Sequence, residues 1–235
     1  MSELINYFSE TCIINLPDRA DRRRQMESEL RKLGSISAGQ VRFVPAIRPK
    51  SKDDWPSIGA RGCFLSHYSV LKQALERELE SVLILEDDCK FRRIDESLQT
   101  KLVNAVAKTE WDILYLGHVL PIPGDREFEL ILSRNPILTA HMYAVKRSCL
   151  NRLVKFLEQL MQREEGHPDG GPQHYDGALS TFRFQNPDIK TLVCMPPMAR
   201  QRSSRSDITT GFLDTVPIVR TAVKHLRHIK NLMVQ

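Results

Sequence analysis

The strongest constraint on the fold comes from residues 82–88, where a short apolar run ends in three consecutive acids. Val82–Leu85 is aliphatic throughout, which is typical of a strand buried on both faces of a sheet. Glu86, Asp87 and Asp88 follow at once, at what would be the carboxyl end of that strand. Open α/β sheets bind their ligands in the crevice at this end of their strands. The segment therefore predicts an α/β fold with a ligand site beside the acids.

The spacing of the three acids predicts how they are divided between the two faces of the sheet. Side chains alternate along a strand, so Glu86 and Asp88 should point to one side and Asp87 to the other. The first and third acids can then share one divalent cation, Mn²⁺ or Mg²⁺, whose other positions go to water and phosphate oxygens. A nucleotide diphosphate would supply such oxygens. A solvated acidic loop after the strand is the alternative interpretation.

Strands and helices are predicted to alternate along the first half of the chain. Expected strands lie at 11–16, 41–47, 82–85 and 112–117, and expected helices at 20–33, 63–79 and 97–108. This order is typical of a mostly parallel sheet flanked by helices. In the second half we expect a loop or hairpin at 121–135, a strand at 138–146, a helix at 148–162, a short helix from Asp176, a strand at 191–195 and a polar irregular stretch at 196–211.

Composition limits the class of protein. The 235 residues are 41% hydrophobic and 27% charged, which suits one soluble globular domain, predicted at residues 1–213. No apolar stretch approaches the roughly 20 residues that span a bilayer, and the N-terminus lacks the features of a secretory signal. Five cysteines without a C-x-x-C pair fit free thiols in a reducing compartment, so a cytoplasmic location is expected.

The net charge of +5 comes largely from local basic clusters. Such clusters attract polyanions, but no recognisable nucleic-acid-binding module accompanies them, so nucleic acid is disfavoured as a partner. Residues 214–235 are predicted to form a basic amphipathic helix. This helix either lies against an anionic membrane surface or packs on the domain.

Five segments carry motifs that point to one family. In order they are Ile14–Leu16 with Arg19, Asp21 and Arg22; Gly59–His67; Leu85–Asp88; Thr139–Tyr143; and Pro197–Gln201 with Ser206–Ile208. Their order and spacing resemble glycosyltransferase family 25, which includes bacterial lipooligosaccharide galactosyl- and glucosyltransferases and is related to collagen galactosyltransferases. The resemblance covers roughly residues 11–208. One departure is Asp18-Arg19, which stands where the family usually carries two arginines after the Asn-Leu pair.

The resemblance implies a GT-A type fold, a nucleotide-sugar donor and transfer with inversion. The leaving diphosphate gains charge, so a metal and cationic side chains aimed at it would stabilise the transition state. Glu86 and Asp88 are the expected metal ligands, with Asp87 as the alternative. Expected catalytic residues are Asp176, as the general base, and His67. The expected donor-binding residues are Asn15, Arg19, Arg22, Ser66, Asp87, Gln201 and Arg202.

Structural alternatives stand beside several of these roles. Ser66 and His67, placed in the first turns of the predicted helix, can serve as a local cap and a packed side chain. Asp176 can be a helix N-cap, and the segment 200–202 a disordered basic linker instead of a loop that closes over the diphosphate. The role of His141 is left open.

These observations predict a cytoplasmic, metal-dependent, inverting transferase that moves galactose or glucose from a UDP-sugar to a saccharide acceptor. A lipid-linked glycan at the inner membrane, as in lipooligosaccharide, is the expected acceptor. A collagen-type activity on a protein acceptor and a catalytically silent glycan- or lipid-binding module are the alternatives.

Overall fold

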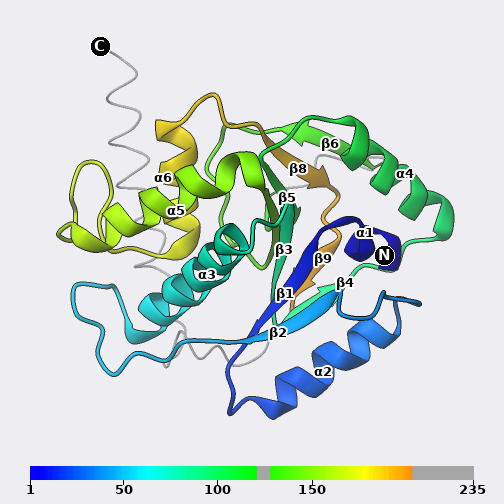
Figure 1. The fold of residues 1–235 in the computed structure, drawn as a ribbon, viewed down its shortest axis with the longest axis horizontal. Coiled ribbons are helices and arrows are strands. Elements are labelled where there is room, and N and C mark those ends of the chain that lie inside the picture. The colour runs from blue at the N-terminus through cyan, green and yellow to red at the C-terminus, as the bar shows by residue number, and fades with distance from the viewer. Residues whose placement is uncertain (121–127, 203–235) are drawn as a thin grey trace. The chain divides into compact units, whose positions relative to one another are not determined.

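The computed structural model describes residues 1–120 and 128–202 (Figure 1). The helices of this part are α1 (Ser2–Tyr7), α2 (Ala20–Arg31), α3 (Ile58–Glu76), α4 (Glu96–Lys108), α5 (Arg147–Gln162) and α6 (Tyr175–Gln185). Its strands are β1 (Glu10–Asn15), β2 (Val41–Pro45), β3 (Ser81–Glu86), β4 (Cys89–Phe91), β5 (Ile113–Gly117), β6 (Glu129–Leu132), β7 (Met142–Lys146), β8 (Thr191–Met195) and β9 (Ala199–Gln201). The expected basic helix at 214–235 lies outside the described residues.

One mixed sheet forms the centre of the described part, with its main strands in the order β2-β1-β3-β7-β5-β8-β6. Strand β1 pairs in parallel with β2 and β3, and β5 pairs in parallel with β8. Strand β7 lies antiparallel between β3 and β5, and β6 lies antiparallel to β8. The predicted α/β class is confirmed. The antiparallel direction of β7 was not predicted, because an apolar run does not reveal the direction of its strand.

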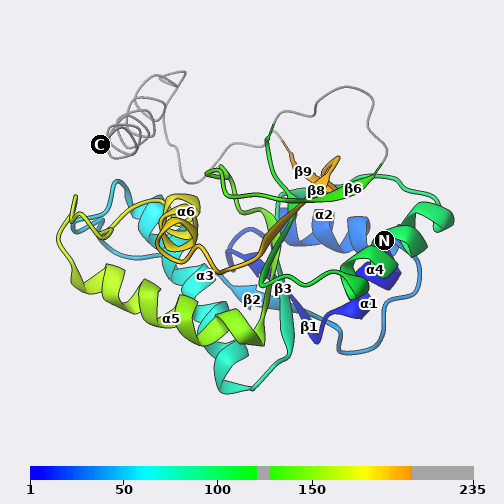
Figure 2. The ribbon, with the colours of Figure 1, turned by 90° about the horizontal axis from the view of Figure 1, so that it is seen from above.

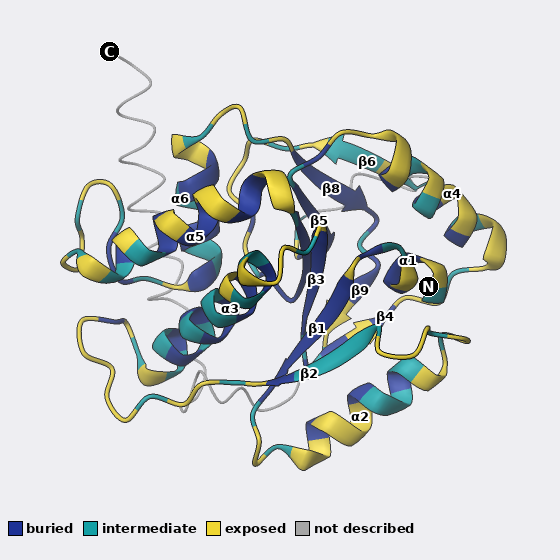
Figure 3. Ribbon diagram, viewed as in Figure 1, coloured by how far each residue is buried: buried dark blue, intermediate teal, exposed yellow. Residues whose placement is uncertain are grey.

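Helices cover both faces of the sheet, with α3, α5 and α6 on one side and α1, α2 and α4 on the other (Figures 1 and 2). The strands of the sheet's centre are buried, and the helices turn their exposed residues outward (Figure 3). Alternate residues of β3 enter two separate apolar clusters: Val82 and Ile84 pack with α3, α5 and α6, while Leu83 and Leu85 pack with α1 and α4. The strand is therefore buried on both faces, as its sequence predicts.

Helix α3 begins earlier than residue 63, where the sequence prediction placed its start. The side chain of Ser57 caps it by accepting a hydrogen bond from the Ala60 amide at 3.0 Å. Gly62 is required on its second turn, because a Cβ there would come within 2.6 Å of the Ile47 carbonyl oxygen. Ser66 and His67 consequently lie well inside the helix, and their predicted place in its first turns was wrong.

Three further boundaries differ from the sequence prediction. Strand β7 starts at Met142 and not at 138, since Thr139 adopts a φ of 71°, which does not fit an extended strand. Strand β9 occupies part of the stretch expected to be irregular, and helix α1 was not expected at all. No helix of the described residues is long and apolar enough to cross a membrane.

Candidate active site at the carboxyl end of the central strands

Glu86 and Asp87 point to opposite faces of the sheet, as strand alternation predicts. Glu86 ends β3 and faces α3, where its Oε1 lies 3.4 Å from His67 Nε2. Asp87 faces α2, where its carboxylate forms an ion pair with Arg22 at 3.1 Å. The turn from β3 to β4 thus places two adjacent acids in two different environments.

Asp87 is fixed by neighbouring side chains. Asn15 Nδ2, at the end of β1, donates to Asp87 Oδ2 at 2.7 Å, and Arg22 Nη1 donates to Oδ1 at 3.1 Å. Both Asp87 and Arg22 are buried. Asn15 and Arg22, both expected to bind the donor, therefore contact Asp87 directly in this structure.

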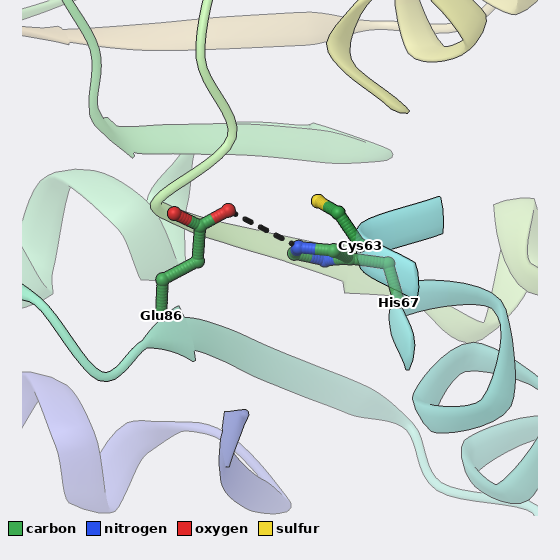
Figure 4. A group of neighbouring side chains, drawn as sticks. All are labelled: Cys63, His67 and Glu86. Carbon is green, nitrogen blue, oxygen red and sulfur yellow. Dashed lines mark hydrogen bonds and ion pairs between the residues drawn. The ribbon is translucent and has the colours of Figure 1, made fainter. Parts of the chain in front are cut away.

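Glu86 is held from two directions. His67 approaches Oε1 from helix α3, as Figure 4 shows, and Gln201 Nε2 donates to Oε2 at 2.9 Å. Burial raises the pKa of Glu86, but the interaction with His67 and the hydrogen bond from Gln201 help to hold that pKa below its ordinary value. Glu86 is therefore an anion at neutral pH, and a carboxylate retains lone pairs beyond its two hydrogen bonds.

Asp88 has a buried oxygen, Oδ1, without a hydrogen-bond partner. Burial, followed by the charges of Glu86 and Asp87, raises the pKa of Asp88 to about 7. An unsatisfied buried carboxylate oxygen is costly and is rare in native proteins. A divalent cation shared with Glu86 would satisfy this oxygen and neutralise the crowded charge, so the residues present fit Mn²⁺ or Mg²⁺.

Strand β9 ties the acidic turn to the distant end of the described chain. It pairs antiparallel with β4, so Gln201 lies opposite Cys89. Arg202 then donates its amide to the Asp88 carbonyl at 2.8 Å and its Nη2 to the Asp87 carbonyl at 2.5 Å. Gln201 and Arg202 are therefore beside the acids, and the segment 200–202 is not a disordered linker in this structure.

Asp176 lies in the first turn of α6, but His174 is the residue that precedes the helix. Its Oδ2 accepts from the Thr139 amide at 3.0 Å, and its Oδ1 accepts from the Gly177 amide at 2.9 Å. Asp176 is therefore not the N-cap residue of α6. The Asp176 charge reaches the site, because it raises the pKa of Cys63 together with burial and Glu86, which contribute more.

Two other predicted residues are engaged elsewhere. The Ser66 hydroxyl donates to the Gly62 carbonyl at 2.6 Å and accepts from the Ile47 amide at 2.8 Å, which ties α3 to the segment after β2. Arg19 precedes α2 and pairs with Asp21 at 3.0 Å. Neither contact involves the acids at the end of β3.

The site also contains side chains to which sequence reasoning gave no role. His67 Nδ1 lies 3.1 Å from Tyr143 Oη, which lies 2.7 Å from Tyr175 Oη, and the His67 ring stacks on Tyr175. Cys63, one helical turn before His67, completes a group with His67 and Glu86 (Figure 4). The four-residue spacing of Cys63 and His67 was a signal for their shared helix face.

His141, whose role the sequence left open, is a buried structural residue. Its Nε2 lies 3.1 Å from the Ala199 carbonyl oxygen, and its Nδ1 lies 3.1 Å from Thr139 Oγ1. Burial lowers the pKa of His141, so its ring is neutral at pH 7. It links β9 to the segment before β7.

A solved structure and curated relatives resemble this chain. The crystal structure of a glycosyltransferase involved in the glycosylation of the major capsid of PBCV-1 aligns with a TM-score of 0.52 at 12% identity, over 84% of this chain and 93% of that one. This likeness concerns the fold alone and agrees with the expected GT-A-like architecture.

Procollagen galactosyltransferase 1-B of Xenopus laevis is 32% identical over 146 residues, which are 51% of this chain and 24% of that protein. Inactive glycosyltransferase 25 family member 3 of Homo sapiens is 34% identical over 130 residues, 47% of this chain and 22% of that protein. The chain thus matches about a quarter or less of the length of these relatives. The family model described as Glycosyltransferase family 25 (LPS biosynthesis protein) matches residues 8–162, which is more than half of the chain. The chain therefore belongs to glycosyltransferase family 25.

Proposed function

We propose that this chain is an inverting glycosyltransferase that moves a hexose, galactose or glucose, from a UDP-sugar to a saccharide acceptor. The observation that carries the proposal is the buried Asp88 oxygen without a hydrogen-bond partner, which is close enough to Glu86 for the Glu86 charge to raise the pKa of Asp88, at the carboxyl end of β3 in a family 25 fold. A lipid-linked saccharide, as in lipooligosaccharide, is the proposed acceptor.

Glu86 and Asp88 are the proposed ligands of Mn²⁺ or Mg²⁺. When bound, the cation would neutralise charge on the departing diphosphate. Asp87 takes a different part: its bonds to Asn15 and Arg22 fix the turn that presents the two neighbouring acids. We therefore favour Glu86 and Asp88 over Asp87 as ligands.

Gln201 and Arg202 are proposed to hold donor phosphate next to the acids. Arg202 reaches the carbonyl of Asp87, and Gln201 reaches the carboxylate of Glu86, so small rotations would bring both to an anion at this point. Arg19 precedes α2 and Arg22 lies in its first turn, and both are proposed to contact the nucleotide. Their cationic side chains also lower the cost of bringing an anion there.

Asp176 is the proposed general base, which takes the proton from the acceptor hydroxyl. Two backbone amides hold its carboxylate in place, which restricts the direction from which a hydroxyl can approach. His67 is proposed to support Glu86, since Tyr143 and Tyr175 fix its ring. Side chains that fix the orientation of their neighbours in this way hold the reacting groups in the geometry that the reaction needs.

A catalytically silent binding module is a second candidate, because the chain is 34% identical over 130 residues to a relative named inactive. A transferase acting on a protein acceptor is a third, because procollagen galactosyltransferases are similar to about half of this chain. The silent module would bind the donor without transferring its sugar, and the third candidate would transfer the sugar to a protein instead of a saccharide.

Incubation with a panel of UDP-sugars and lipooligosaccharide or collagen-peptide acceptors, followed by mass analysis of the products, tests the proposal. We expect a mass increase of one hexose on the saccharide acceptor that depends on Mn²⁺ or Mg²⁺. Calorimetry of the same donors with and without Mn²⁺ provides the control. Donor binding that ignores the metal, without any product, would support the silent module instead.

A further inference from the structure

Three side chains at the end of β3 offer metal-ligating atoms of a different kind from the paired acids. Cys63 Sγ, one ring nitrogen of His67 and a Glu86 carboxylate oxygen all lie within 4.8 Å of one another. Figure 4 shows the thiol and the imidazole on one face of α3, turned toward the carboxylate. Their sequence positions explain this, because residues four apart on a helix are neighbours on its surface.

The chemistry of this donor set selects a thiophilic cation. Thiolate and imidazole are ligands that Zn²⁺ and Co²⁺ prefer, whereas Mg²⁺ prefers oxygen throughout. With Zn–N and Zn–S bonds of about 2.0 and 2.3 Å, tetrahedral ligand atoms lie roughly 3.5 Å apart. The His67 Nε2 to Glu86 Oε1 separation is 3.4 Å, which already matches this geometry. The other pairs of ligand atoms lie within 4.8 Å, so rotation of the side chains would have to bring them about 1 Å closer at most.

The surroundings of His67 favour metal binding through Nε2. In the structure without metal, Nε2 can hydrogen-bond to Glu86, 3.4 Å away. In a metal-bound form, the tautomer that carries its proton on Nδ1 would donate to Tyr143 Oη, 3.1 Å away, and leave the Nε2 lone pair to the cation. Stacking on Tyr175, with centroids 4.2 Å apart and planes 11° apart, fixes the ring. An outer partner on the second ring nitrogen is the usual arrangement for a metal-bound histidine.

We propose that Cys63, His67 and Glu86 form a binding site for one thiophilic divalent cation, with Zn²⁺ as the physiological candidate. The fourth position is left to water or to the neighbouring Asp88. The binding itself does not depend on the proposed function. A consequence that does rest on it is competition with Mn²⁺, because Glu86 belongs to both sites.

Co²⁺ titration of the metal-free, reduced protein tests the site without any assay of activity. We expect a thiolate-to-cobalt charge-transfer band in the near ultraviolet that saturates at one Co²⁺ per chain. One equivalent of Zn²⁺ should remove the band, and excess Mg²⁺ should leave it unchanged. Absence of the band in the unaltered protein, or its removal by Mg²⁺, would overturn the proposal.

Variants identify the ligands. Cys63→Ser should abolish the band, while Cys12→Ser should keep it, because Cys12 is a buried free thiol next to Glu10 and far along the chain from the group. Tyr143→Phe should keep the band but weaken Co²⁺ binding about 10- to 100-fold, as expected for loss of an outer partner. If Cys63→Ser does not fold, judged by circular dichroism, Glu86→Gln takes its place, with a loss of at least about tenfold in affinity expected. A band that persists in Cys63→Ser, or unchanged affinity in Glu86→Gln, contradicts the assignment.

Discussion

Glu10, which is buried, and Asp88, which is partly buried, lie at opposite ends of the same sheet, and their surroundings differ completely. Glu10 begins β1 and accepts hydrogen bonds from Arg42 and Arg77, both at distances of 2.7 to 3.1 Å. Asp88 follows β3 and has an oxygen without a partner. Burial raises the pKa of both acids, but the two arginines outweigh it for Glu10 and lower its pKa to about 2. The pKa of Asp88 rises to about 7.

This difference separates an acid whose oxygens are satisfied within the fold from one that still has an oxygen available to a ligand. A carboxylate whose oxygens are all satisfied by the protein contributes to folding and has little left to offer a cation. An unsatisfied carboxylate costs stability until something binds it, which is a pattern found at functional sites. Loss of the Glu10 charge should therefore lower the free energy of unfolding and leave transfer unchanged. Loss of the Asp88 charge should lower transfer and leave the free energy of unfolding unchanged or raised.

The largest effect is expected for Asp88→Asn, which removes a charge at constant shape. If the cation contributes about 4 kcal/mol to the transition state, transfer should fall about 1000-fold. The free energy of unfolding of the metal-free protein at pH 7 should stay the same or rise, because a buried like charge is lost. Product formation and urea denaturation measure the two quantities. Near-normal transfer by this variant would remove Asp88 from the metal site.

Asp176→Asn should lower turnover about 100-fold while leaving the affinity for UDP-sugar nearly unchanged, since a general base acts in the transition state. Asparagine can still accept from the Thr139 amide, so the local fold should persist. Steady-state kinetics and calorimetry give the comparison. A parallel fall in donor affinity and turnover would instead assign Asp176 to donor binding.

Much of this site could be predicted from sequence, but its contacts could not. The run 82–88 predicted both the buried strand and the division of Glu86 and Asp87 between the two faces, because strand alternation is a local rule. The link from His67 to Tyr143 and Tyr175 joins residues 76 and 32 positions apart, and no local pattern encodes it.

Strand β9 was missed for a related reason. It is three residues long and partly polar, and it becomes a strand through its pairing with β4 and, at Ala199, with Gly117 of β5. Pairing energy between distant segments overrides local propensity in such cases. The direction of β7 was likewise decided by its neighbours β3 and β5.

Glu10→Gln tests the comparison between Glu10 and Asp88 at the Glu10 end of the sheet. Loss of the charged hydrogen bonds to Arg42 and Arg77 should lower the free energy of unfolding by about 2 kcal/mol. The effect should stay below that of a fully buried pair, because both arginine side chains are partly exposed and water can solvate them. Transfer by the folded variant should be unchanged. Loss of activity without loss of stability would contradict a purely structural role for Glu10.

The last prediction concerns the dependence of stability on pH. The pKa of Glu10 in the folded protein, about 2, lies below its ordinary value of 4.5, so its stabilisation is full above pH 4.5 and is lost as pH falls toward 2. The pKa of Asp88, about 7, lies above its ordinary value of 3.8, so stability should decline as pH rises from about 4 to about 7. Denaturation midpoints should be measured across pH. The loss of stability below pH 4.5 should be smaller in Glu10→Gln, and the decline between about pH 4 and about pH 7 should be smaller in Asp88→Asn. Unchanged slopes in both variants would remove the electrostatic basis of the comparison.

Mn²⁺ binding in the presence of UDP tests the central claim most directly, because it asks whether the acids at the carboxyl end of β3 hold a cation together with a diphosphate. Calorimetric titration should be run on the unaltered chain, Asp88→Asn and Glu10→Gln, each checked for folding by circular dichroism. The account predicts UDP-dependent Mn²⁺ binding in the unaltered chain and in Glu10→Gln, and its loss in Asp88→Asn. Equal Mn²⁺ affinity in Asp88→Asn and the unaltered chain would contradict the account.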